Sequence, residues 1–189
     1  MSDTRIRIIR AARTLFHEQG YGATGVATIQ REAGVKPGSF YHFFPAKEAL
    51  LEAVLDDYSA ALRPELINPA TESVADPFEK IFSLLNFYRE ALIETGFAFG
   101  CPLGNLALEV GRQPGPVTEK IEANFRQWRE VVRGWLERAG LNAGADDLAT
   151  LTLTVMEGAV MQARAARSIA PFDASVRELR RYLELLRAP

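Results

Sequence analysis

The sequence predicts an all-α protein of about nine helices, and two observations lead to this prediction. Apolar residues recur at helical spacing along most of the chain, for example at Ile121, Phe125, Trp128 and Val132. No segment shows the period of two residues that is typical of a half-buried strand. The chain has 189 residues and is 48% hydrophobic, which is enough for one large core or two small ones.

The N-terminal part is predicted to form a three-helix head. Asp3 or Thr4 can cap the first helix, whose apolar positions follow helical spacing until Gly20 ends it. Two short helices are expected next, at about 26–33 and about 37–43.

The junction between the two short helices has the composition of a tight turn. Gly34 stands where the first of them must stop, because glycine accepts the left-handed backbone conformation that such a stop needs. Pro37 lacks a backbone N–H group, which costs nothing in the first turn of the next helix. The pattern therefore predicts a helix-turn-helix. Pro45 then precedes a helix of about 46–62, which is long enough to link the head to the body.

The rest of the chain is predicted to form a helical body. Pro64, Pro69 and Pro77 indicate a broken linker after the connecting helix. Beyond it, helices are expected at about 78–95, 101–110, 117–139, 145–167 and 173–187.

Composition excludes several classes of protein. There is no run of about 18 apolar residues, so no membrane-spanning helix is expected. The first residues lack the apolar stretch of a signal peptide, and the single cysteine, Cys101, cannot form an intramolecular disulfide, so we expect a cytoplasmic protein. Residues 1–50 hold seven Lys or Arg against four Asp or Glu, whereas the remainder holds 15 against 20. A mildly basic head on an acidic body is consistent with one end facing phosphate.

The most informative pattern lies within residues 28–50. Its components are Ala33–Gly34–Val35, residues 38–44 from Gly38 to Phe44, and residues 45–50 from Pro45 to Leu50, preceded by residues 11–16 and by Gly20–Tyr21. Over roughly residues 4–55, this segment resembles the DNA-binding domain of the TetR family of bacterial helix-turn-helix transcriptional regulators. The resemblance implies a head of residues 1–48, joined through the helix at 46–62 to an effector-binding and dimerisation body of residues 49–189.

The resemblance also implies which residues meet DNA. Tyr41 and Lys47 match family residues that bind phosphate; the alternative is a core tyrosine and an ordinary exposed lysine. Lys36–Pro37 stands where the family often has Ser-Lys or Ser-Arg, so the positive charge has moved by one position and no base preference is carried over from the family. The full predicted set is Thr28, Gln30, Lys36, Pro37, Gly38, Ser39, Tyr41, His42 and Lys47.

In the body, the resemblance implies a pocket for a small, largely apolar effector. The candidate lining residues are Tyr88, Phe97, Phe99, Cys101, Phe125 and Trp128. The alternative is that these positions are plain core, since aromatic residues at helical spacing usually are. Cys101 directly precedes Pro102 at a helix start, where the helix dipole can make a thiol reactive. It is therefore either a redox or electrophile sensor or a small packing residue.

The expected function is that of a ligand-responsive DNA-binding regulator, most simply a repressor that binds a palindromic operator on double-stranded DNA and is released by its effector. The resemblance implies a homodimer formed through the last two helices. The pattern leaves open an activator. A small all-α enzyme or a helical adaptor are the alternatives from other classes. Two histidines and one cysteine offer few nucleophile–base pairs, and no phosphate loop or metal-spaced cluster appears, so we expect no enzyme, cofactor or metal site.

Overall fold

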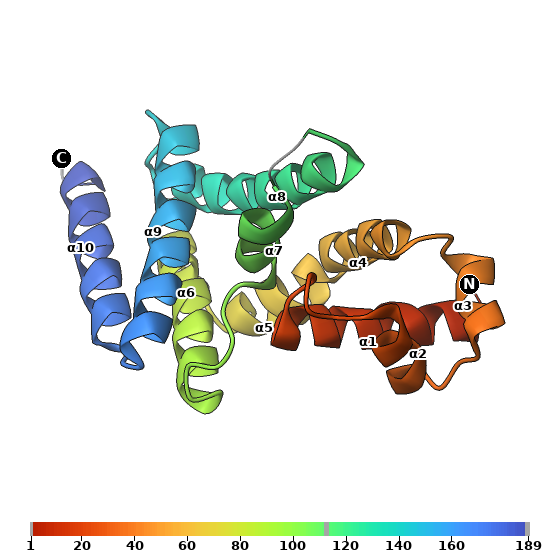
Figure 1. Cartoon of the computed structure of the whole chain (residues 1–189). Coiled ribbons are helices and arrows are strands. Elements are labelled where there is room, and N and C mark those ends of the chain that lie inside the picture. Colours follow the sequence, from red (N-terminus) through yellow and green to blue (C-terminus); the bar gives the residue numbers. More distant parts are fainter. Residues whose placement is uncertain (1, 112–113, 188–189) are drawn as a thin grey trace. The chain divides into compact units, whose positions relative to one another are not determined.

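The computed structural model describes residues 2–111 and 114–187 (Figure 1). Its helices are α1 (Asp3–Gln19), α2 (Val26–Glu32), α3 (Pro37–Phe43), α4 (Lys47–Ala61), the π-helix η1 (Leu62–Ile67), α5 (Asn68–Thr71), α6 (Pro77–Glu94), α7 (Pro102–Val110), α8 (Pro116–Arg138), α9 (Ala145–Ala166) and α10 (Ala170–Arg187). If α4, η1 and α5 are counted as one bent helix, the described residues hold nine helices and no strand. The all-α prediction is therefore confirmed. None of the described helices is long and apolar enough to cross a membrane.

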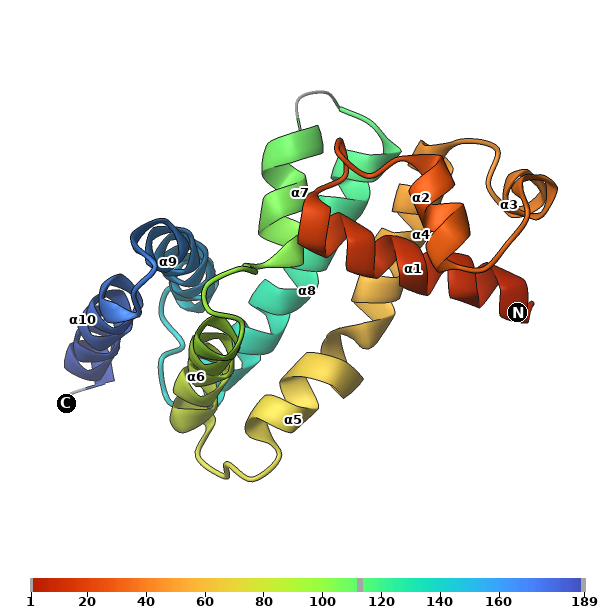
Figure 2. The same cartoon turned by 60° about the horizontal axis from the view of Figure 1, so that its bottom comes forward.

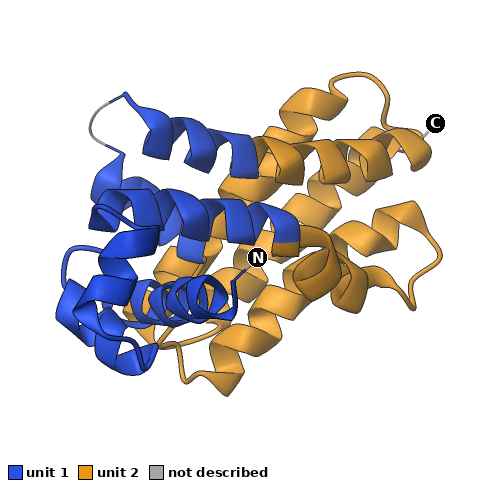
Figure 3. Cartoon of the chain, turned by 90° about the vertical axis from the view of Figure 1, so that its right-hand side faces the viewer, with its two compact units in different colours: residues 1–60, 102–124 blue, residues 61–101, 125–189 orange. Residues whose placement is uncertain are grey.

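The helices form two compact units, coloured separately in Figure 3. The first unit comprises residues 1–60 and 102–124, and within it α1 packs against α2, α3 and α7. Its core is built from one side of each helix, with Ile8 and Phe16 of α1, Ile29 of α2 and Phe40 of α3 all buried. The DNA-binding motif predicted from the sequence thus shares a unit with α7, a helix far along the chain.

The second unit comprises residues 61–101 and 125–189. Its helices α9 and α10 lie side by side, and both pack against α6 (Figure 2). Phe78 and Ile81 of α6, Met156 of α9 and Phe172 of α10 are all buried in its core. The helix α8 contributes its first turns to the first unit and the remainder to the second.

The predicted broken linker is wrong for residues 62–71, whereas the break before Pro77 is present as a non-helical stretch over residues 72–76. The chain stays helical from Leu62 through Thr71, first as the π-helix η1 and then as α5. A proline cannot donate the regular helical hydrogen bond, and π geometry is a rare local form that occurs mostly as single turns within α-helices. Pro64 falls in η1, and Pro69 falls in the first turn of α5, where its missing N–H group costs little. Burial of Ile67 and of neighbouring residues favours the helical course.

Two helix starts also differ from prediction. Ser2, rather than Asp3 or Thr4, occupies the N-cap of α1. The last helix begins at Ala170, three residues earlier than expected, because Pro171 is readily accommodated in a first helical turn.

The connection between α1 and α2 is held by a buried hydroxyl. Thr24 is fully buried, and its Oγ1 lies 2.7 Å from the carbonyl oxygen of Gly20 and 3.2 Å from that of Leu15. The single hydroxyl proton has its shorter contact with Gly20, the C-cap of α1, whose carbonyl the helix leaves without a partner.

Replacing Thr24 with Val should lower the free energy of unfolding by about 1–3 kcal/mol, because an isosteric side chain without a donor leaves a buried carbonyl unsatisfied. Thr24→Ser is the matched control. It keeps the hydroxyl and loses one methyl group, at a cost of about 0.8 kcal/mol. Denaturant titrations of the three proteins measure both values, and a Val variant as stable as the Ser variant would contradict this role.

Candidate DNA-binding surface

The turn between α2 and α3 is fixed by backbone geometry. Gly34 has a φ of 63°, the left-handed conformation expected for it from the sequence. The N–H group of Val35 donates to the carbonyl of Gln30 at 3.0 Å, which closes the end of α2. The guanidinium of Arg7 donates to the carbonyl of Ala33 at 3.2 Å, so α1 also holds this turn.

The helix α3 has one buried face and one exposed face. Phe40 and Phe44 are buried, and their ring centroids lie 6.1 Å apart. Phe43 is half-buried and packs edge-on against His42, with 4.8 Å between the ring centroids. Tyr41 is 55% exposed.

The predicted DNA-binding residues divide into two groups by exposure. The exposed group comprises Lys36, Pro37, Gly38, Ser39, Tyr41 and His42, which follow one another along α3 and the residue before it. The half-buried group comprises Thr28, Gln30 and Lys47, on α2 and at the start of α4. The exposed group thus lies along α3 and at its N-cap, while the half-buried residues keep part of their surface open to solvent.

Lys47 lies at the start of α4 and contacts Tyr21 in the connection between α1 and α2. Its Nζ donates to the carbonyl of Tyr21 at 2.5 Å and lies 4.1 Å from the centroid of the Tyr21 ring. Burial lowers the pKa of the Lys47 amine, while the negative charge of Glu109 acts in the opposite direction. Burial, together with the charges of Glu48 and Glu109, raises the pKa of Tyr21. No sequence pattern pointed to Glu109 at this site, since that residue is on α7.

The predicted effector residues all lie in the second unit, but they differ in their surroundings. Trp128 is buried and packs edge-on against the half-buried Tyr88, with 5.6 Å between ring centroids. Phe97, Phe99 and Phe125 are half-buried. Phe97 also has a φ of 63°, an unusual conformation for a residue with a side chain.

Cys101 is buried, with 2% of its surface exposed, and its thiol donates a hydrogen bond to the carboxylate of Glu157 on α9. Burial raises the pKa of Glu157, and the hydrogen bond from Cys101 partly offsets that shift. The Oε1 atom of Glu157 is buried without a hydrogen-bond partner. The side chain of Arg164 lies against Gly100, the residue before Cys101. The group hydrogen-bonded to the thiol is nevertheless a carboxylate.

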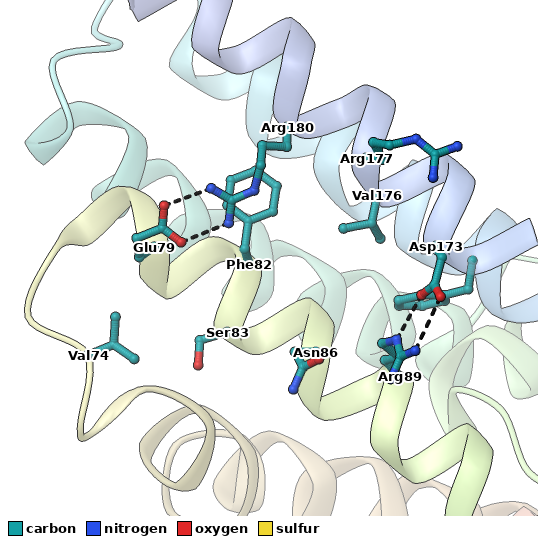
Figure 4. Close-up of a pocket in the computed structure, with 11 residues that line it drawn as sticks. Val74, Glu79, Phe82, Ser83, Asn86, Arg89, Asp173, Val176, Arg177 and Arg180 are labelled. Atoms are coloured by element: carbon teal, nitrogen blue, oxygen red, sulfur yellow. Dashed lines mark hydrogen bonds and ion pairs between the residues drawn. The ribbon is translucent and has the colours of Figure 1, made fainter. Parts of the chain in front are cut away.

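A groove of about 650 Å³ lies between α6 and α10 in the second unit (Figure 4). Two ion pairs bridge the helices along it. Arg180 meets the carboxylate of Glu79 with two bonds of 2.7 Å, and Arg89 meets that of Asp173 at 2.8 and 3.2 Å. The Arg180 guanidinium also lies 3.7 Å from the ring centroid of Phe82. Sequence analysis missed this groove, because spacing within one helix does not reveal pairing between two.

The outer face of α9 and α10 carries a second groove, of about 450 Å³. Its lining includes Leu151, Val155 and Gly158 of α9 and Tyr182 of α10. Leu151 and Tyr182 are large apolar or aromatic side chains that remain 37% and 45% exposed. Within the described part of the chain, no group of three or more His, Cys, Asp and Glu side chains could hold a metal ion.

Comparison with known protein families gives two matches that follow the order of the chain. Residues 8–54 match the family of bacterial regulatory proteins described as the tetR family. Residues 77–178 match the C-terminal domain of LmrA/YxaF-like transcriptional regulators. The two matches cover the helix-turn-helix and most of the second unit.

Individual relatives extend over nearly the whole chain. An uncharacterised helix-turn-helix-type regulator of Mycobacterium tuberculosis is 30% identical over 97% of this chain and 95% of its own length. The regulator LmrA of Bacillus subtilis is 29% identical over 89% of this chain and 90% of its own. Among solved structures, the regulatory protein TetR from Rhodobacter sphaeroides superposes with a TM-score of 0.84 at 25% identity, covering 95% of this chain and 98% of that one. The chain therefore belongs to the TetR family of DNA-binding transcriptional regulators.

Proposed function

We propose that this regulator is a cytoplasmic repressor that binds a palindromic operator as a homodimer and is released by a small, largely apolar effector. The observation that carries the proposal is the exposure of Lys36, Ser39, Tyr41 and His42 along α3 and at its N-cap, while Phe40 of the same helix is buried. A helix held in this way can enter the major groove with its N-terminal end. A two-fold dimer then reads two half-sites about one helical turn apart.

The outer face of α9 and α10 supports the proposed homodimer. Leu151 and Tyr182 lie exposed beside the small residue Gly158, so two copies of this face can approach closely. A two-fold interface places the same patch on both subunits, which is what a palindromic operator requires. Leu185 and Leu186 at the end of α10 extend the apolar surface.

For the effector, the contact between Tyr88 and Trp128 supports a site in the second unit. Aromatic side chains at such a site provide apolar surface for a ligand of matching character. We propose that the effector occupies this region and changes the separation of the two heads, which lowers operator affinity through a coupling between the two sites. No catalytic role is proposed for the chain.

The hypothesis of redox or electrophile sensing through Cys101 is less well supported. Such a sensor needs an accessible thiolate, whereas Cys101 is 2% exposed and its thiol donates to a carboxylate. These two observations favour the packing alternative.

Lys47→Ala should weaken binding to operator and to random DNA alike, because a phosphate contact carries no sequence information. A dimer loses two contacts, so the slope of log affinity against log salt should shrink by roughly two units, at about 0.9 per phosphate. Mobility-shift titrations over a salt series measure the slope. Lys80→Ala on α6 removes the same charge far along the chain and serves as the control. An unchanged slope for folded Lys47→Ala would reject the phosphate contact.

Lys36→Ala should change base preference rather than general affinity. Lys36 is exposed at the N-cap of α3, the end expected to reach base edges. A direct contact would contribute about 1–3 kcal/mol of discrimination at one symmetric pair of operator positions. Selection from a random DNA library reports the preference of both proteins, and identical preferences would show that Lys36 does not read bases.

Glu157→Gln should change how stability depends on pH. The pKa of Glu157 is raised in the folded protein, so this carboxyl is protonated when folded at pH values where it is already ionised when unfolded. The free energy of unfolding of the wild type should therefore fall relative to that of the variant as pH rises above about 4.5, the pKa of this carboxyl in the unfolded chain. The fall should be complete once the pH exceeds the raised pKa of Glu157 in the folded protein. Denaturant unfolding of both proteins from about pH 4 to about pH 8 measures this difference. A difference that is constant over the range would contradict the burial effect.

A further inference from the structure

A carboxylate from α7 is bound by the backbone of the turn between α1 and α2. The N–H group of Tyr21 donates to Oε2 of Glu109 at 2.8 Å, and the N–H group of Gly22 donates to Oε1 of the same carboxylate. Two successive backbone N–H groups directed at one anion form a concave anion site. Because the acceptor is charged, these hydrogen bonds are of the stronger kind.

The glycines on either side of Tyr21 allow this close approach. A Cβ atom at Gly22 would lie 2.8 Å from Oε1 of Glu109, and one at Gly20 would lie 3.3 Å from Oε2. Gly20 also has a φ of 84°, where a side chain would be strained. The turn thus has room for the carboxylate only because both positions lack a side chain.

The same turn holds the lysine that we propose as a phosphate contact. The carbonyl of Tyr21 accepts from Nζ of Lys47, and the Tyr21 ring lies beneath the ammonium group. An ammonium group has three donors, so one bond to Tyr21 leaves donors that can reach a phosphate. Tyr21 therefore contacts both side chains with its backbone: its N–H group donates to Glu109, and its carbonyl oxygen accepts from Lys47.

We infer that Glu109 is a positioning residue for DNA binding, since its carboxylate fixes the Tyr21–Gly22 turn and the turn holds Lys47 at the start of α4. This inference rests on the proposed phosphate contact of Lys47. Glu109 lies within the residues that match the C-terminal domain family, whereas Tyr21 and Lys47 lie within those that match the DNA-binding family. A displacement of α7 would therefore release the turn and with it the DNA-binding lysine.

Two simpler roles for Glu109 predict different effects of its removal on DNA binding. As a plain surface charge, it would repel DNA phosphate, and its removal would strengthen binding slightly without changing the number of contacts. As a purely structural tether, it would lower stability, and its removal would reduce affinity by the same factor whether or not Lys47 is present. Positioning through Lys47 instead predicts that the two residues act on one contact, so their effects on binding do not add.

The experiment is a double-mutant cycle on operator affinity across a salt series, with wild type, Glu109→Ala, Lys47→Ala and the double variant. Lys47→Ala should reduce the salt slope by roughly two units, and Glu109→Ala should reduce it by a large part of the same amount, at about 0.9 per phosphate. Glu109→Ala should have no further effect once Lys47 is replaced. Glu119→Ala, an exposed acid in the first turn of α8, removes the same charge without touching the turn and should leave the slope unchanged.

Gly22→Ala provides a second test that keeps the carboxylate in the chain. Its Cβ atom would lie only 2.8 Å from Oε1, which is too close for two non-bonded atoms, so it should displace Glu109 and reproduce the reduced slope. Amide hydrogen exchange at residues 21 and 22 should be faster in both variants, which verifies that the turn has been released in a folded protein.

The results distinguish the phosphate contact of Lys47 from the positioning role of Glu109. If wild type binds DNA without salt dependence, or if Lys47→Ala leaves the slope unchanged, the proposed phosphate contact fails and the role of Glu109 fails with it. If Lys47→Ala behaves as expected while Glu109→Ala matches wild type, or if the two effects add, only the positioning role is overturned.

Discussion

The DNA-binding surface depends on the burial of Phe40. A helix of seven residues, such as α3, is not stable by itself in water, so tertiary packing must hold it. Phe40 and Phe44 provide that packing on one side of the helix. Since each residue turns the helix by about 100°, burying Phe40 directs Tyr41 and His42 away from the core. The residues that we propose to read DNA are therefore exposed as a consequence of which aromatic residues are buried.

The turn between α1 and α2 shows how distant parts of the chain can act on that surface. Thr24 closes the turn from within through its buried hydroxyl, and Glu109 binds it from outside, 88 residues after Tyr21. Thr24 donates to a carbonyl at the end of α1, whereas Glu109 accepts from two N–H groups that lie beyond the helix. The short head is thus completed by a helix from the later part of the chain.

In the second unit, two ion pairs set the register between α6 and α10. The pairs Glu79–Arg180 and Arg89–Asp173 are part-exposed, so each contributes little to stability. They orient the two helices, because a bidentate guanidinium–carboxylate pair has a fixed geometry. Arg180 lowers the pKa of Glu79 through its hydrogen bond, and the Glu79 carboxylate raises the pKa of Arg180 in turn. Phe82 beneath the Arg180 guanidinium joins this polar contact to the apolar core.

Periodicity and turn chemistry determined the fold class, the positions of most helices and the exposed face of α3. These features are local, since hydrophobic spacing, Gly34 and Pro37 act within a few residues of themselves. The tertiary structure decided the rest. It kept the chain helical past Pro64, because π geometry and the burial of Ile67 outweigh the lost hydrogen bond. It buried Cys101 against Glu157, and it brought Glu109 to the turn beside Lys47. Such pairings join residues that are far apart in the sequence, and no local pattern encodes which distant side chain will fill a given place.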